Sequence, residues 1–281
     1  MKSRIVSCAV GLAALFLALP ADAVPVPLDG PTTDWTALAF GGAADADDAG
    51  NPESEIVGDP NHSAVYYAFD DLGTPSLTDG TLYFRMRLGQ DQGGAGFSRT
   101  AIVGIDADLD GGVDLLVGIV GQSSVIVRHV TGAGTSPSTT GISATGTNVT
   151  ATAANSNWSA VSSATDPTAS DFDLNNDGTD YFISWSVDFA TVVQELQNLG
   201  IGGFTQVSAV RFVAGTSTNN SNLNQDIAGT TGNTGSATPW GTLGAFTSNP
   251  VPVPEPGTGA LLALGLAALG HHSRRAGSRR R

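Results

Sequence analysis

Apolar and polar residues alternate in short segments along most of this chain. A period of two places one face of a strand toward a core and the other toward water. The pattern is clearest in residues 64–69, 82–88, 101–105, 113–120, 124–130, 181–187 and 207–213. Separate short strands of this kind predict an all-β fold, and we expect a single jelly-roll-like β-sandwich.

One segment has helical spacing instead. The apolar residues between Asp188 and Gly200 are Ala190, Val193, Leu196 and Leu199. Asp188 can cap the start of a helix and Gly200 can end it. We expect one short helix whose apolar stripe covers a sheet edge or the mouth of the sandwich.

Residues 135–154 and 216–238 are rich in Ser, Thr, Gly and Asn. They predict long surface loops or weak edge strands. All-β sandwiches of about 200–250 residues are commonly single domains. We therefore assign residues 24–247 to one sandwich domain.

The first 23 residues have the pattern of a signal peptide. Lys2 and Arg4 precede an apolar stretch, and Ala21 and Ala23 supply the small residues that signal peptidase reads. Cleavage after Ala23 would remove Cys8, the one cysteine of the chain. The exported protein would then contain no disulfide.

The other end of the chain also has a membrane-targeting pattern. A proline-rich spacer, residues 248–256, contains Pro254, Glu255 and Pro256 and precedes an apolar run over residues 257–270. Arginines follow only on the far side, as in an oriented membrane segment. The run would span about 21 Å as a helix, which is short against a hydrocarbon core of about 30 Å. Residues 257–281 are thus predicted to be a membrane helix with an Arg-rich tail.

This C-terminal segment resembles the PEP-CTERM sorting signal of exported bacterial proteins. The resemblance implies that exosortase recognises Pro254, Glu255 and Pro256, removes the helix, and releases or re-attaches the protein at the cell surface. It also implies a transient inner-membrane intermediate and a final place at the surface or in the extracellular matrix. The alternative is a C-terminal anchor that is never processed.

The region between the two ends is strongly acidic. Residues 24–254 hold five arginines, no lysine and 24 acidic residues, a formal net charge of −19. Such a surface repels nucleic acid and favours solubility or the uptake of cations. We expect no nucleic-acid partner.

Two acidic segments have carboxylates at alternate positions followed by glycine, which lets a loop fold around a hard cation. The predicted metal ligands are Asp106, Asp108, Asp110 and Asp114 in the first segment, and Asp173, Asn175, Asp177 and Asp180 in the second. Both segments lack the final glutamate of an EF-hand. Either a structural Ca²⁺ or plain turn chemistry explains them. In the first segment, four carboxylates within nine residues repel one another, and a bound cation would remove this repulsion. Ca²⁺ is therefore more strongly indicated at the first segment than at the second.

No pair of acidic residues stands out as catalytic. The only histidines before the C-terminal tail are His62 and His129, and no Gly-x-Ser-x-Gly motif accompanies them. We expect a protein that is not an enzyme.

Exposed aromatic rings could stack on sugars, although packing in the core is the favoured interpretation. The residues concerned are Trp35, Tyr66, Tyr67, Tyr83, Trp158 and Trp240. Short motifs at residues 28–35, 82–85 and 103–111 resemble family nine carbohydrate-binding or DOMON-like β-sandwiches. This resemblance implies a jelly-roll-like body.

Together these features predict an exported surface or matrix protein without catalytic activity, associated with exopolysaccharide. The alternative is a carbohydrate-binding module that acts on extracellular glycan. The predicted partners of the protein are signal peptidase, exosortase and an extracellular polysaccharide.

Overall fold

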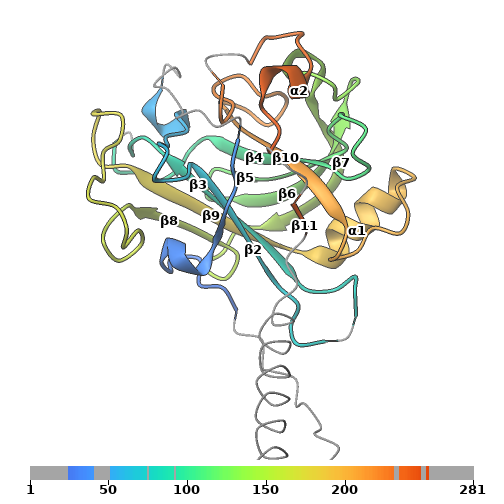
Figure 1. Ribbon diagram of the computed structural model, residues 1–281, viewed down its shortest axis with the longest axis horizontal. Coiled ribbons are helices and arrows are strands. Elements are labelled where there is room, and N and C mark those ends of the chain that lie inside the picture. Colours follow the sequence, from blue (N-terminus) through green and yellow to red (C-terminus); the bar gives the residue numbers. More distant parts are fainter. Residues whose placement is uncertain are drawn as a thin grey trace, which may run out of the picture.

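Two antiparallel β-sheets face each other in the computed structural model (Figure 1). The structure describes residues 25–40, 51–74, 76–91, 93–230 and 234–247, and the backbone of residues 251–252. The prediction of an all-β sandwich is confirmed.

The first sheet has the strand order β1-β2-β3-β9-β8. Its strands are β1 (Thr36–Ala37), β2 (Val65–Asp70), β3 (Thr81–Leu88), β9 (Tyr181–Asp188) and β8 (Ser156–Ala160). The second sheet has the order β11-β10-β4-β5-β6-β7. Its strands are β11 (Val251–Pro252), β10 (Ala209–Ser217), β4 (Thr100–Asp106), β5 (Leu115–Val120), β6 (Ser124–Thr131) and β7 (Gly141–Thr150).

Every segment predicted from alternation is a strand in the structure. The polar stretch 135–154 contains the edge strand β7, one of the two possibilities left open for it. The short strands β1 and β8, both at edges of the first sheet, were not predicted. Short helical turns also lie outside the prediction: three 3₁₀ turns, η1 (Thr32–Asp34), η2 (Pro52–Ser54) and η3 (Pro137–Thr139), and the helical turn α2 (Trp240–Leu243).

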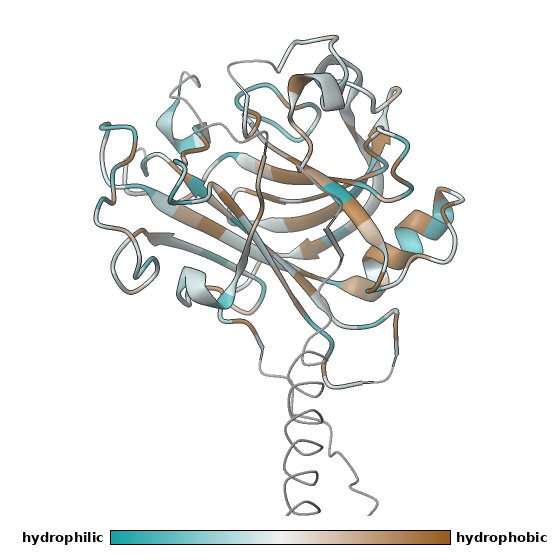
Figure 2. Cartoon of the chain, in the orientation of Figure 1, coloured by the Kyte–Doolittle hydropathy of each residue, from teal (hydrophilic) through white to brown (hydrophobic). Residues whose placement is uncertain are grey.

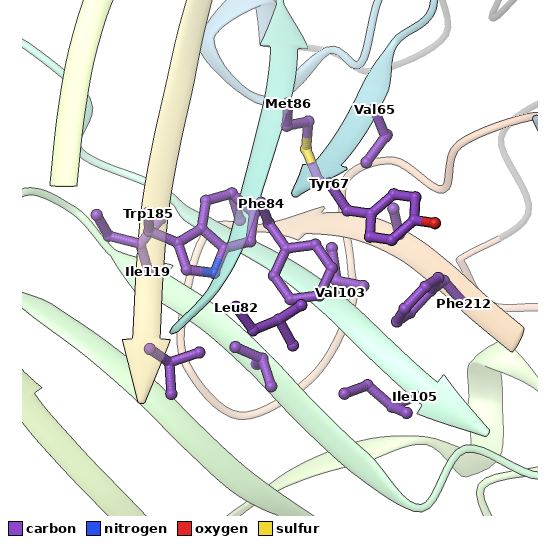
Figure 3. Close-up of a cluster of buried hydrophobic side chains, with 14 of the residues drawn as sticks. Val65, Tyr67, Leu82, Phe84, Met86, Val103, Ile105, Ile119, Trp185 and Phe212 are labelled. Carbon is purple, nitrogen blue, oxygen red and sulfur yellow. The ribbon is translucent and has the colours of Figure 1, made fainter. Parts of the chain in front are cut away.

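The main core fills the space between the sheets. Figure 3 shows Phe84 and Trp185 of the first sheet packed toward Phe212, Ile105 and Ile119 of the second. The rings of Phe84 and Phe212 meet edge to face, with centroids 5.6 Å apart. Figure 2 shows hydrophobic segments of the strands, in brown, alternating with neutral or hydrophilic segments, in white or teal.

The outer face of the first sheet differs from the sequence-based expectation. Alternate positions of β9 were predicted to face water, yet Ser184 is fully buried and Ser186 nearly so. A second apolar cluster covers this face, to which Leu28 and Trp35 of the N-terminal segment contribute. The polar residues on this face of β9 therefore lie beneath another layer of chain.

The predicted helix is present as α1 (Phe189–Asn198) and packs against β6 and β9. Its buried face was predicted only in part. Val193 and Leu196 are buried as expected, together with Phe189 and Val192, but Ala190 and Leu199 are exposed. Asp188 precedes the helix, but its side chain accepts no capping hydrogen bond from the backbone N–H groups of the first turn.

Within the described residues, no helix has the length and apolar character needed to span a membrane. The predicted signal peptide, residues 1–23 with Ala21 and Ala23, lies outside these residues. So do Pro254, Glu255, Pro256 and the predicted membrane helix of residues 257–281.

Candidate metal centre

The first aspartate segment forms the tight loop between β4 and β5. Its backbone turns through positive φ at Leu109 (64°) and Gly111 (92°). Side chains secure this turn: Asp106 Oδ2 accepts from the Gly111 N–H at 3.3 Å, and Asp114 Oδ2 accepts from the Ala107 N–H at 2.8 Å. Two Asx turns add to these bonds, because Asp108 Oδ1 accepts from the Asp110 N–H at 3.1 Å and Asp110 Oδ1 accepts from the Gly112 N–H.

Three of the four predicted ligands come together. One carboxylate oxygen each of Asp106, Asp108 and Asp114 lies within 4.8 Å of the other two. Asp106 is fully buried, and its Oδ1 atom has no hydrogen-bond partner. Asp110 stands outside this cluster, and its Oδ1 accepts from the Gly112 N–H at 2.7 Å.

The electrostatics of the cluster disfavour the ionised acids. Burial raises the pKa of Asp106 to about 6, and the charge of Asp114 adds to the effect. Burial likewise raises the pKa of Asp114 to about 6, and the charges of Asp108 and Asp110 also raise it. A cation placed among these oxygens would relieve both costs.

The second aspartate segment repeats the backbone scaffold of the first. Asn176 has a φ of 64° and Gly178 a φ of 137°. Asp173 Oδ1 accepts from the Gly178 N–H at 3.1 Å, and Asp180 Oδ2 accepts from the Leu174 N–H at 3.2 Å. These bonds correspond to those that Asp106 and Asp114 make in the first loop.

The carboxylate environment of the second loop is nevertheless different. Asp180 Oδ2 accepts from Arg87 Nε at 2.7 Å and lies 2.5 Å from Arg87 Nη2, and both side chains are fully buried. Burial raises the pKa of Asp180 to about 6, although Arg87 lowers it. Among the described residues, Asp173, Asp177 and Asp180 do not belong to a group of three acidic or histidine side chains whose ligand atoms lie within 4.8 Å of one another.

Sequence reasoning missed the role of Arg87 and of its neighbour Arg85. Both lie on the covered face of β3 and are fully buried. Arg87 also pairs with Asp166 Oδ2 at 3.4 Å. Arg85 donates to Ser184 Oγ at 2.9 Å and lies 4.3 Å from the centroid of the Trp35 ring. Two arginines at alternate strand positions are the sequence signal that could have indicated a buried polar layer.

The aromatic residues divide as the favoured interpretation expected. Five of the six are buried, namely Trp35, Tyr66, Tyr67, Tyr83 and Trp240. Trp158 is partly exposed and stacks on Tyr181, with ring centroids 4.8 Å apart. It lines a groove of about 370 Å³ between β8 and the turn after β5, together with Gln122 and Asn157.

Both histidines bond to carboxylates. His62 Nδ1 lies 2.9 Å from Asp59 Oδ1, and His129 Nε2 lies 2.9 Å from Glu195 Oε2 on α1. The side chains of His62 and His129 are only 11% and 15% exposed. Both side chains are therefore largely buried.

Fold and site together define an antiparallel β-sandwich with an aspartate-lined loop at one end of its second sheet. Residues 252–281 match the family model described as the PEP-CTERM protein-sorting motif. The chain is thus an exported protein that carries this motif, which implies processing by exosortase and sorting to the cell surface. No curated protein and no solved structure matches the chain. The resemblance of the body to family nine carbohydrate-binding or DOMON-like sandwiches stays a prediction.

Proposed function

We propose that this protein is a non-enzymatic component of the cell surface or extracellular matrix, held there by association with exopolysaccharide. The observation that carries this proposal is the sorting motif at residues 252–281, which gives the protein an extracellular destination. Exosortase acts on a transient inner-membrane form, and signal peptidase removes residues 1–23.

The charge of the body supports a matrix role of a particular kind. Of the five arginines in residues 24–254, Arg85 and Arg87 are buried. The solvated positive charge of the body therefore comes from Arg99, Arg128 and Arg211, against a large excess of carboxylates. Such a surface repels acidic polysaccharide. The associated polysaccharide is therefore neutral, or is bridged to the protein by divalent cations.

The histidine contacts fit a structural interpretation. The His129–Glu195 bond joins β6 to α1, and Glu195 also accepts from Thr147 Oγ1 of β7 at 2.8 Å. His62 and Asp59 form a local pair within one loop. Both pairs tie chain segments together.

Cell fractionation with and without exosortase tests the proposal. With exosortase, the protein should appear in the matrix fraction, and mass spectrometry should show that the C-terminal arginines are gone. Without exosortase, it should stay in the inner membrane. Removing the exopolysaccharide should then release the processed protein into the medium. Full-length protein in the cytosol would contradict the proposal, as would retention at the surface without any polysaccharide.

The groove beside Trp158 favours one second candidate, a carbohydrate-binding module. Gln122, Ser156 and Asn157 offer polar groups beside the indole ring. Aromatic rings with nearby hydrogen-bonding side chains suit the apolar and hydroxyl faces of a sugar. The indole N–H of Trp158 donates to Asp91 Oδ2 at 3.3 Å, which fixes the orientation of the ring.

A glycan array separates this candidate from the leading proposal. A binding module should retain particular glycans and lose them in Trp158→Ala. Val207→Ala is the matched control, because Val207 is an exposed apolar residue that does not line the groove. An array without signal, or binding that Trp158→Ala leaves unchanged, would exclude the groove as the sugar site.

A further inference from the structure

We propose that the loop between β4 and β5 binds one Ca²⁺ through Asp106, Asp108 and Asp114, and that the related loop of residues 173–180 binds none. The two loops share a sequence pattern and a backbone scaffold. They differ in the positive charge that compensates the negative charge of their aspartates.

Asp106 is the residue that points to a ligand. Its side chain is fully buried, and Oδ1 lies among protein atoms without a hydrogen-bond donor. A buried carboxylate oxygen without a partner is costly, and native proteins satisfy such groups with donors, water or ions. One carboxylate oxygen each of Asp108 and Asp114 lies within 4.8 Å of a carboxylate oxygen of Asp106, so a cation is the partner that suits the whole group.

No cationic side chain of the described residues is paired with this cluster. Among the ion pairs of the described residues, none involves Asp106, Asp108 or Asp114. On a neighbouring strand, the backbone of Arg211 pairs with that of Asp106 in the β10–β4 ladder. Arg211 forms no ion pair with any of the three acids. The segment that packs on the loop through Gly134 O and the Val113 N–H consists of Gly132, Ala133 and Gly134, which carry no charge.

The donor set selects the metal. All three side chains offer carboxylate oxygen, which suits hard cations and not zinc or copper. Ca²⁺ accepts irregular oxygen cages made by a flexible loop, whereas Mg²⁺ demands near-octahedral geometry and keeps several waters. Extracellular calcium modules commonly bind with dissociation constants of about 10⁻⁴ to 10⁻³ M. The proposed function places this loop in that setting, although calcium binding itself does not depend on exopolysaccharide association.

The second loop already has its cation. Arg87 contacts Asp180 and Asp166 at full burial, and Asp180 is the buried carboxylate of that loop. The guanidinium group bonds to Oδ2 of Asp180, so this carboxylate already faces a positive charge, while its Oδ1 has no hydrogen-bond partner. A second ion would therefore add positive charge next to a buried arginine.

The calcium loop also lies close to the start of the sorting motif. β10 pairs with β4 on one side, where Arg211 faces Asp106, and with β11 on the other, where Ala209 faces Pro252. β11 therefore runs toward the end of the sheet at which β4 enters the loop. The family-model match begins at residue 252, so the loop marks the motif-proximal end of the sandwich.

Calorimetry and thermal unfolding test the proposal on the purified exported protein. After chelation, CaCl₂ should bind with a stoichiometry of one and raise the melting temperature, and MgCl₂ at the same concentration should do much less. Asp106→Asn should abolish the heat of binding. Asp108→Asn changes an exposed ligand, so it should fold normally and weaken binding roughly ten-fold. Asp173→Asn, in the second loop, is the matched control and should keep wild-type binding.

Three results would overturn the proposal. The first is no heat and no melting shift at about 10 mM Ca²⁺, ten-fold above the weak end of extracellular modules. The second is binding that survives both Asp106→Asn and Asp108→Asn. The third is a stoichiometry of two that falls to one in Asp173→Asn. These outcomes concern the ion alone, so they are distinguishable from a failed test of matrix association.

Discussion

Two loops of this protein have nearly the same sequence pattern and backbone scaffold, but different electrostatics. In each loop, the backbone N–H of the residue after the first aspartate donates to the side chain of the last aspartate. The N–H of a glycine donates to the side chain of the first aspartate. Asp180 of the second loop pairs with Arg87, whereas no ion pair of the described residues involves the buried Asp106 of the first loop. Each of these two aspartates keeps one carboxylate oxygen without a hydrogen-bond partner. Turn formation is thus local in both loops, but charge compensation depends on what the fold places beside them.

Position relative to the sheets explains this difference. Arg87 reaches Asp180 from the covered outer face of β3, under the layer formed by the N-terminal segment and the chain before β9. The first loop ends β4 in the other sheet, where no arginine of the described residues pairs with it. The same aspartate-rich turn therefore contributes a carboxylate to a buried ion pair beside the first sheet, whereas in the second sheet none of the described ion pairs involves it.

Removal of Arg87 should have the largest effect. Arg87→Met leaves Asp166 and Asp180 buried without their cation, and breaking a buried pair on one side costs about 3–5 kcal/mol. Urea unfolding should show this loss both in Ca²⁺ and in chelator.

Arg128→Met is the control for that substitution. Arg128 bonds at the surface to Ala144 O and Asn148 Oδ1, so its loss should change stability by only about 0.5 kcal/mol. If Arg87→Met cost no more than Arg128→Met, the second loop would not depend on the buried arginine.

Neutralising one acid in each loop should have opposite effects. Burial and repulsion raise the pKa of Asp106, so its ionised form disfavours the folded state at pH 7 when no cation is bound. Asp106→Asn should therefore raise the free energy of unfolding in chelator by roughly 1–2 kcal/mol, since one pKa unit corresponds to about 1.4 kcal/mol. Urea unfolding in EDTA would measure the change.

Asp180→Asn should instead lower stability. The raised pKa of Asp180 indicates that burial of its charge is costly. However, the substitution would leave the buried Arg87 with only one counterion, Asp166, at 3.4 Å. The expected loss is about 1–3 kcal/mol, typical of a weakened hydrogen bond to a buried charge. A change of the same sign in both variants would contradict the electrostatic difference between the loops.

What the sequence predicted well is what local pattern determines. Alternation located β2, β3, β4, β5, β6, β9 and β10, and the aspartate-glycine pattern located both turns. Asp180 and Arg87 are 93 residues apart, so no pattern among neighbouring residues predicts their contact. The face of α1 was misjudged for a related reason. Phe189, at the first helical position, is buried against Phe69 of β2 and Phe204, both of which lie outside the helix.

The smallest predicted effect concerns the backbone that the loops share. Leu109 and Asn176 occupy corresponding positions, each with a φ of 64°. A left-handed conformation costs most residues about 1–2 kcal/mol, whereas asparagine adopts it readily. Leu109→Gly should therefore raise the free energy of unfolding by up to about 1 kcal/mol after the entropy cost of glycine. Asn176→Gly should change it by only a few tenths. Equal gains at both positions, measured by urea unfolding at fixed Ca²⁺, would mean that the leucine is not strained.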